Sequence, residues 1–302
     1  MADCVLTLIA APAAAGALDR GLLAAAHALA QLGARVGPAD WLDPGIACDL
    51  PFSELDPDQA DAAVRAALGD AAIDAIAQDA GGRRKRLLVA DMESTIIANE
   101  MLEELADFLG LREMVAEITR QAMNDEIDFA GALKQRVALL KDLPETVLAT
   151  AGAQIRVNPG AAELVATMRA NGARTALVSG GFHVYTRRIR DELGFDLEVA
   201  NALEVADGRL TGMVREPIVA RAAKLQTLTR LAAELGIPLS ATLAVGDGAN
   251  DLPMIEAAGL GVAYHGKPAV ARRARARIDH ADLRALLYAQ GYRRDEIVTG
   301  PG

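Results

Sequence analysis

The chain has 302 residues, of which 52% are hydrophobic and only 3% are aromatic, and its formal net charge is −10. This length can form one large domain or two ordinary ones. The excess of acidic residues argues against a nucleic-acid-binding protein, which usually presents a basic surface. No apolar run reaches the roughly 18 residues of a membrane span, and the first residues lack the basic segment of a signal peptide. We therefore expect a cytoplasmic protein that binds neither nucleic acid nor membrane.

The first 82 residues have their own pattern of strands and helices. Apolar runs between turn residues predict strands, and apolar residues at helical spacing predict two helices. Their order predicts a small α+β domain with both helices on one face of a sheet. The expected strands are Val5–Ile9, Arg35–Trp41, Ile46–Phe52 and Ala72–Ala77, and the expected helices are Leu18–Leu32 and Asp58–Leu68.

This order of elements resembles the amino-acid-sensing ACT fold. The resemblance implies that residues 1–82 bind a small ligand. A domain that only docks or dimerises, without a ligand, is an equally good interpretation of the same pattern. A homodimer formed through this domain is therefore one expected assembly.

The strongest internal boundary is Gly81–Arg86, where two glycines precede four cations. Four consecutive cations are costly to bury, so this segment predicts an exposed linker between two domains, residues 1–82 and 83–302. A basic binding patch is the alternative interpretation, but the run is short and the chain is acidic.

Strands and helices alternate after the linker, which predicts an α/β domain with a mainly parallel sheet. Three apolar runs, Leu87–Ala90, Thr175–Val178 and Thr242–Val245, each end in polar residues. Ligands of open α/β sheets bind outside the carboxyl ends of the strands, so the residues after these runs form the candidate site. Residues 99–153, approximately, are helical and too long for one crossover, which predicts an inserted helical cap. Asp207-Gly208 predicts a hairpin turn.

Asp91 and Glu93 stand two residues apart directly after the first of these runs. A carboxylate can attack phosphorus, and an aspartyl-phosphate intermediate divides one difficult hydrolysis into two easier steps. The second acid can protonate the leaving oxygen and then activate water. Taken alone, such a pair is more often a turn or a helix N-cap.

Three further motifs follow. Gly246–Asp251 places two acids on a glycine-rich turn, which suits Mg²⁺ but also suits a tight strand-to-helix turn. Ser179–Phe182 opens an apparent helix, whose N–H groups, with the Ser179 hydroxyl, can hold a phosphate. Lys224 can neutralise charge on a transferred phosphoryl group, although a lone lysine usually lies on the surface.

In this order, the four motifs resemble those of the haloacid dehalogenase superfamily of aspartate-nucleophile phosphatases, and most closely its phosphoserine phosphatase family, over about residues 84–287. The resemblance implies a three-layer core with a parallel sheet beneath a helical cap. It also implies that Asp91 is the nucleophile, Glu93 the general acid and base, and Lys224 the lysine that neutralises the phosphate. Asp91, Asp247 and the backbone carbonyl of Glu93 would bind Mg²⁺, while Ser179 and Gly180 would bind the phosphate, supported by Asn250 and Asp251.

The resemblance extends into the cap and there implies the substrate class. Glu100 matches the acid that pairs with the substrate ammonium group. Arg136 matches the arginine that takes the substrate carboxylate with its guanidinium fork, a geometry that lysine cannot supply. Met123 and Phe129 match the pocket beside it. Without the resemblance, Arg136 would be interpreted as a solvated helix residue and Phe129 as a core residue.

The motifs and the resemblance together predict a Mg²⁺-dependent enzyme that hydrolyses O-phosphoserine to serine and phosphate, the last step of serine biosynthesis. Glu93 departs from the family pattern, which has aspartate there. The extra methylene moves the carboxyl group by up to about 1.5 Å, and a misplacement of about 1 Å can cost on the order of 100-fold in rate. Two alternatives are a phosphotransferase that uses another alcohol, such as homoserine, as acceptor, and a serine-sensing regulatory protein with weak activity.

Overall fold

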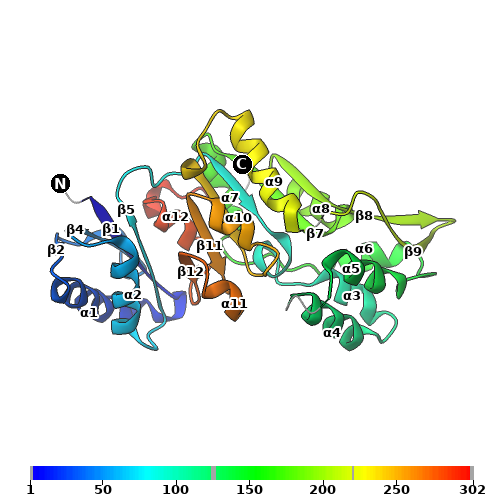
Figure 1. Ribbon diagram of the computed structural model, residues 1–302, viewed down its shortest axis with the longest axis horizontal. Helices are drawn as coiled ribbons and strands as arrows, with labels where there is room; N and C mark the ends of the chain where they lie inside the picture. The colour runs from blue at the N-terminus through cyan, green and yellow to red at the C-terminus, as the bar shows by residue number, and fades with distance from the viewer. Residues whose placement is uncertain (1–2, 124–126, 220, 300–302) are drawn as a thin grey trace.

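The structure, a computed structural model, describes residues 3–123, 127–219 and 221–299. Its strands form two sheets, a small antiparallel sheet at one end of the molecule and a large, mainly parallel sheet in the middle (Figure 1). A group of helices forms a cap at the other end. None of the helices in these ranges is long and apolar enough to cross a bilayer.

The N-terminal segment forms the α+β, ACT-like unit that the sequence predicts. Its elements are β1 (Cys4–Ala10), α1 (Leu18–Gln31), β2 (Arg35–Val36), β3 (Asp40–Asp43), β4 (Ala47–Ser53), α2 (Pro57–Leu68) and β5 (Ile73–Asp79). The central strand β1 pairs antiparallel with β4 and β5, and β4 also pairs with β2 and β3. The single strand predicted at Arg35–Trp41 is wrong, because Gly37 and Pro38 interrupt it and leave two short strands.

Both faces of this small sheet are covered, which explains the continuous apolar run of β1. All of β1 is buried. Leu6 and Leu8 pack in a cluster with residues of α1 and α2. Ile9, like Ile76 of β5, instead joins the apolar cluster of the large sheet. The small sheet is therefore a layer between its own helices and the rest of the molecule.

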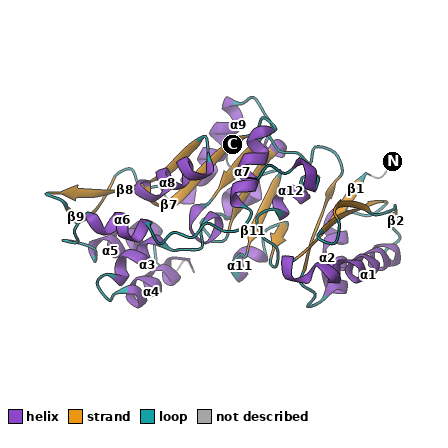
Figure 2. Ribbon diagram, turned by 180° about the vertical axis from the view of Figure 1, so that it is seen from behind, coloured by secondary structure: helices purple, strands orange, loops and turns teal. Residues whose placement is uncertain are grey.

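The large sheet has the strand order β12-β11-β10-β6-β7-β8-β9, in which β9 runs antiparallel to β8 and the other neighbours are parallel. Leu87 and Val89 pack toward α9 and α10, whereas Leu88 and Ala90 pack toward α7 and α8, which makes three layers (Figures 1 and 2). This confirms the predicted core. Its elements are β6 (Leu87–Ala90), α7 (Ala161–Ala170), β7 (Arg174–Phe182), α8 (His183–Leu193), β8 (Leu197–Ala206), β9 (Arg209–Arg215), α9 (Arg221–Glu234), β10 (Thr242–Gly246), α10 (Leu252–Ala257), β11 (Leu260–Tyr264), α11 (Pro268–Ala271), β12 (Ala276–Ile278) and α12 (Ala285–Ala289).

The cap between β6 and β7 is helical, as predicted. It contains α3 (Met101–Asp107), α4 (Arg112–Met123), α5 (Phe129–Ala138) and α6 (Thr146–Gly152). The hairpin of β8 and β9 turns at Asp207 and Gly208, both with positive φ, and this confirms the turn prediction. The hairpin also holds the cap, because the N–H groups of Asp142 and Glu145 donate to the carbonyls of Leu210 and Gly208.

The linker prediction is wrong for two of the four cations. The Lys85 side chain is buried, and its ammonium donates to the carbonyls of Gly82 and Ser240, 2.9 Å away in each case. Arg83 forms an ion pair with Asp49 of β4 and donates to the Thr7 hydroxyl of β1. Hydrogen-bond partners on the small sheet, in the linker and in the turn before β10 therefore compensate for the burial of these cations. The domain boundary between residues 82 and 83 stays a prediction.

Candidate active site

The candidate site lies where β6 and β10 end side by side. The chain runs from β6 to β7 on one side, whereas β10 pairs with β6 on the other, so this is the switch point at which such sheets bind ligands. The Asp91 N–H donates to the Val245 carbonyl at 3.0 Å, and this bond fixes the end of β6 against β10. Asp91 and Asp247 consequently emerge from neighbouring strands at one edge.

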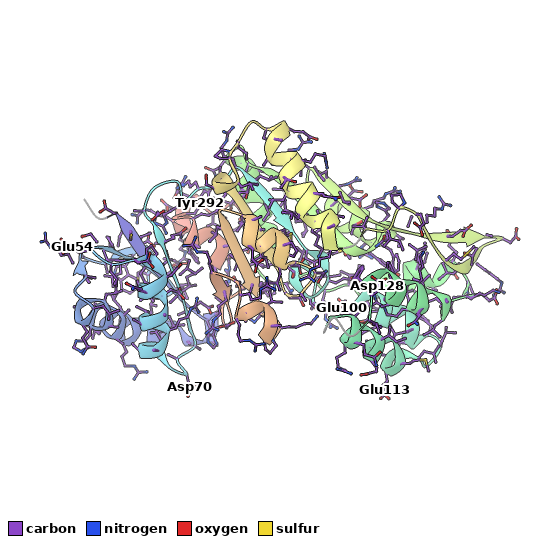
Figure 3. All side chains as sticks on the ribbon, viewed as in Figure 1. Glu54, Asp70, Glu100, Glu113, Asp128 and Tyr292 are labelled. Carbon is purple, nitrogen blue, oxygen red and sulfur yellow. The ribbon has the colours of Figure 1, made fainter. Side chains whose placement is uncertain are left out.

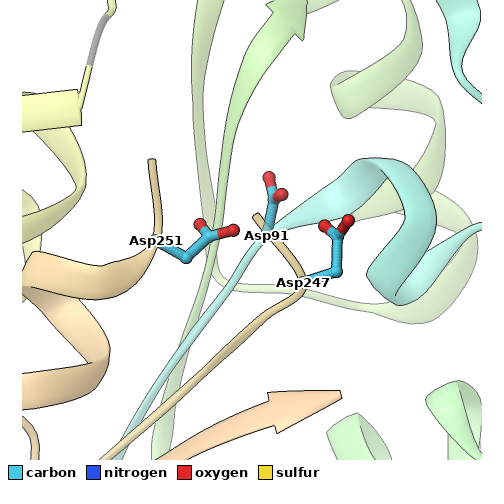
Figure 4. Close-up of side chains that lie close together, drawn as sticks. All are labelled: Asp91, Asp247 and Asp251. Atoms are coloured by element: carbon cyan, nitrogen blue, oxygen red, sulfur yellow. The ribbon is translucent and has the colours of Figure 1, made fainter. Parts of the chain in front are cut away.

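Three aspartates meet there, and Figure 4 shows their carboxylates turned toward a common space. One oxygen each from Asp91, Asp247 and Asp251 lies within 4.8 Å of the others, and all three residues are buried. Lys224 of α9 is 1% exposed, and its Nζ lies 2.7 Å from Oδ1 of Asp91 and 2.6 Å from Oδ1 of Asp251. The other oxygen of Asp251 accepts the N–H of Gly248. Asp251 is therefore held in place by Lys224 and the turn.

The electrostatics of this cluster show an excess of negative charge. Burial raises the pKa of Asp91 well above its usual range, and the Asp251 charge adds to this although Lys224 opposes it. Burial also raises the pKa of Asp247 to about 6. Burial alone would lower the pKa of Lys224, but Asp251 and Asp91 outweigh it and keep the lysine charged. An added cation would relieve the crowding of carboxylates.

Glu93 lies two residues beyond Asp91, in an irregular turn at Met92–Ile96 in which its own backbone is extended. Its Oε1 accepts the N–H of Met101 at 2.9 Å. Burial raises the pKa of Glu93 to about 8, and the neighbouring Glu100 charge adds to this shift. At neutral pH the group is therefore mostly protonated, which is the form that a general acid needs.

The glycine pair lies at the end of β7, not at the start of a helix as the sequence predicts, and forms the opposite wall of the pocket. Gly180 and Gly181 line it, and α8 begins directly after Phe182. A Cβ on Gly181 would lie 2.9 Å from the Glu93 carboxylate, so this position has no room for a side chain. Ser179 is fully buried behind the pair, where its hydroxyl oxygen accepts the Gly181 N–H at 2.9 Å. Its contact with a phosphate stays a prediction.

The cap closes the pocket from the other side. Phe129, Leu133 and Arg136 of α5 line it together with Thr119 of α4. Arg136 is 6% exposed, and its Nη1 donates to the Thr119 hydroxyl at 2.8 Å. Burial lowers the pKa of Arg136, while Glu93 and Glu100 oppose that shift. Among the described residues, no carboxylate lies within ion-pair distance of this guanidinium.

Three predicted site residues remain to be placed. Glu100 lies where the cap meets the core (Figure 3), and its Oε1 accepts the Ser94 hydroxyl at 2.7 Å. Asn250 lines the pocket beside Asp247. Met123 ends α4, and its side chain is outside the described part of the structure.

Sequence reasoning missed several residues of the pocket, among them Lys267 and Thr119. Lys267 follows β11, the strand beyond β10, and its Nζ lies 3.3 Å from Oδ2 of Asp247. The same strand-end argument that selects Asp91 and Asp247 could have found it. Thr119 carried no sequence signal, because its role depends on α4 lying beside α5.

A sequence model of the haloacid dehalogenase-like hydrolase family matches residues 88–256. The chain is 45% identical over 215 residues to a phosphoserine phosphatase of Streptomyces coelicolor, and the match covers 71% of this chain and 52% of that protein. The chain thus spans about half the length of this curated relative.

Two solved structures extend the similarity. A haloacid dehalogenase family hydrolase of Salmonella enterica serovar Typhi superposes with a TM-score of 0.81 at 29% identity, over 97% of this chain and 99% of that one. A structure described as a phospho-aspartyl intermediate analogue of phosphoserine phosphatase superposes with a TM-score of 0.65 at 40% identity, over 68% of this chain and 98% of that one. The first match includes the N-terminal sheet, whereas the second covers about two thirds of the chain.

Proposed function

Because the chain belongs to the haloacid dehalogenase-like hydrolase family, we propose that it is a Mg²⁺-dependent phosphatase that hydrolyses O-phosphoserine to serine and phosphate. The observation that carries this proposal is the pairing of two features in one pocket. Asp91 stands beside Lys224 on the core side, and Arg136 faces it from the cap without a carboxylate partner among the described residues. A phosphate and a carboxylate on one small molecule would match these two positions.

In the first step, a carboxylate oxygen of Asp91 attacks the phosphorus atom. The bond from phosphorus to the serine oxygen breaks, and protonated Glu93 gives its proton to that oxygen. Lys224 offsets the negative charge on the transferred group, because stabilising charge is most of the catalysis in phosphoryl transfer. The products of this step are serine and an aspartyl-phosphate on Asp91.

In the second step, Glu93, now ionised, takes a proton from a water molecule. The water oxygen attacks phosphorus, and the bond to the Asp91 carboxylate breaks and releases phosphate. Glu93 ends the cycle protonated. Its raised pKa supports both roles, since a group with a pKa near the working pH can give and take a proton.

The residues present fit Mg²⁺, which prefers oxygen ligands and needs few of them from the protein. Asp91 and Asp247 offer buried carboxylate oxygens within reach of one another, and burial raises the pKa of both groups, so a bound cation would stabilise their ionised forms. These two residues, with the backbone carbonyl of Glu93, would hold the ion. When bound, it would polarise the phosphoryl oxygens and lower the cost of their charge.

The substrate class is supported by the charges around the pocket. Arg136 can take a carboxylate, Glu100 can take an ammonium group, and Phe129 closes the space between cap and core. Phosphoserine carries all the matching groups, whereas a sugar phosphate has neither the ammonium nor the carboxylate. We therefore expect turnover to fall in the order phosphoserine, phosphothreonine, sugar phosphate.

The direct test is phosphate release with Mg²⁺ from these three substrates. Asp91→Asn should abolish turnover while keeping the fold, because the amide is isosteric but not nucleophilic. A variant that kept a tenth of the activity would contradict the covalent route. Equal phosphate release from all three substrates would keep the phosphatase assignment and contradict phosphoserine as the preferred substrate.

The carboxylate contact has its own test. Arg136→Lys should raise KM for phosphoserine about 10- to 100-fold, since a bidentate charged contact is lost, and should leave KM for p-nitrophenyl phosphate unchanged. Lys134→Ala is the matched control, because Lys134 lies on the same helix but pairs with Glu216 at the surface. Equal KM increases for both substrates would contradict the assignment.

A further inference from the structure

Lys267 occupies the solvent side of the aspartate cluster. Its backbone N–H donates to the Asp247 carbonyl at 3.0 Å, and its Nζ lies 3.3 Å from Oδ2 of the same residue. The side chain is 46% exposed. Lys267 lines the pocket between core and cap and also the two hollows beside that pocket. The ammonium can therefore leave Asp247 without displacing packed side chains.

The two lysines of the site are bound differently. Lys224 forms ion pairs with both Asp91 and Asp251, and its side chain is buried. Lys267 contacts Asp247, which is not paired with Lys224. Asp247 is thus the aspartate of the cluster whose charge is balanced by a movable cation.

An ammonium in contact with a carboxylate opposes binding of a divalent cation to the same group. The two positive charges repel at short range, and each needs the oxygen that the other uses. We propose that Lys267 competes with the divalent cation for Asp247. Its ammonium balances Asp247 in the metal-free protein and moves toward Glu100 and Glu103 at the mouth of the pocket when the cation binds. This inference rests on the proposed function, because it takes Asp247 as a metal ligand.

The contacts at the mouth support this second position. Glu100 and Glu103 line the outer hollow that Lys267 also lines. Ser94 donates one hydrogen bond to Glu100, and Glu103 has Arg112 at 4.0 Å. Both acids therefore keep capacity for a further cation, and Lys267 need not become unpaired when it leaves Asp247.

The test is a titration of the full chain with Mn²⁺, in which electron paramagnetic resonance measures the free ion. Lys267→Met should bind Mn²⁺ about 3- to 10-fold more tightly than the wild type, the effect expected from one nearby charge. Lys267→Arg should stay close to the wild type, because it keeps the charge. Arg273→Met is the matched control, since Arg273 is similarly exposed and pairs with Glu256 away from the cluster. Its affinity should not change.

Thermal unfolding gives a second measurement that needs no turnover. At the same ligand concentration, a ligand that binds more tightly stabilises the folded protein more. Mn²⁺ should therefore raise the Tm of Lys267→Met more than that of the wild type. Equal or weaker binding by Lys267→Met would overturn the competition and leave the proposed phosphatase intact. Failure of the wild type to bind Mn²⁺ at all would overturn the metal site, and this inference with it.

Discussion

Glu93 shows how a longer acid is accommodated where the family pattern has aspartate. Its carboxylate lies directly over Gly181, at a distance that leaves no room for a Cβ there. Its Oε1 is fixed by the Met101 N–H at the start of α3. The extra methylene is therefore absorbed by space above a glycine, and the acid is held by the first residue of the cap helices.

This environment predicts the behaviour of two variants. Glu93→Ala should lose about 10²- to 10⁴-fold in phosphoserine turnover, because general acid and base catalysis are both removed. With p-nitrophenyl phosphate, whose leaving group needs no proton, the same variant should release one equivalent of p-nitrophenol rapidly and then turn over slowly. Glu93→Asp should stay active. Rapid-quench kinetics would measure the burst, and near-native phosphoserine turnover by Glu93→Ala would contradict the assignment.

At the level of single residues, the sequence predicts side chains that follow a strand and misses those placed by contacts between elements. Asp91 and Asp247 are both predictable, because the ends of neighbouring parallel strands meet. Thr119, which holds Arg136, is not, since nothing in the sequence states that α4 lies against α5 at this position. The pKa of Glu93 is equally hidden, because it depends on burial under the cap.

Among the elements, the cap lies close to the core at Phe129. A Cβ on Gly180 would lie 2.9 Å from Cζ of Phe129, which is closer than van der Waals contact. Gly180 thus lets α5 approach the end of β7. The pocket between α5 and β7 is closed at this point because Gly180 has no side chain to keep Phe129 away.

Gly180→Ala should therefore push α5 away from the end of β7. We expect kcat/KM for phosphoserine to fall about 10- to 100-fold, as for other displacements of about 1 Å, with a small change in stability. Steady-state kinetics measure this. Gly131→Ala is the control on the same helix, since its Cβ would meet nothing closer than 3.4 Å. If Gly180→Ala had wild-type kinetics, the closed position of the cap would not govern catalysis.

The elements themselves were largely predictable, but their docking was not. The hairpin turn at Asp207-Gly208 follows from local sequence, and the cap helices follow from apolar spacing. The hydrogen bonds that carry the cap on this hairpin, from Asp142 to Leu210 and from Glu145 to Gly208, join residues more than 60 positions apart. Periodicity within one segment carries no information on such a pairing.

Over the whole molecule, the N-terminal sheet is fastened to the large sheet by buried polar groups as well as apolar ones. Arg83 pairs with Asp49 of β4, and the Tyr288 hydroxyl of α12 donates to Asp43 of β3 at 2.8 Å. The four consecutive cations at Arg83–Arg86 predict a solvated linker as long as their hydrogen-bond partners are unknown. Arg83 is an interface residue here, and Lys85 is buried against the core, because Asp49 and the carbonyl of Ser240 come to them from distant parts of the chain.

Asp74 of β5 makes several of these polar contacts with a single carboxylate. It is 1% exposed, and its carboxylate accepts the backbone N–H groups of Asp279, His280 and Ala281 at 2.7, 3.2 and 2.8 Å. Burial raises the pKa of this carboxyl, although the three donors oppose the shift. The segment it holds follows β12 and reaches the hollow beside Asp247 and Lys267. The small sheet thus contacts the backbone of a segment that borders the candidate site.

Asp74→Ala should therefore lower the free energy of unfolding by on the order of 3 kcal/mol, because it leaves buried N–H groups without an acceptor. Urea denaturation measures the change. Asp74→Asn keeps one acceptor oxygen and should lose less. Asp70→Ala removes an exposed carboxylate of the same N-terminal unit (Figure 3) and should change stability by less than about 0.5 kcal/mol. If Asp74→Ala were as stable as Asp70→Ala, the apolar contacts of Ile9 and Ile76 would suffice to hold the two sheets together, and the carboxylate would serve only to orient the segment beside the site.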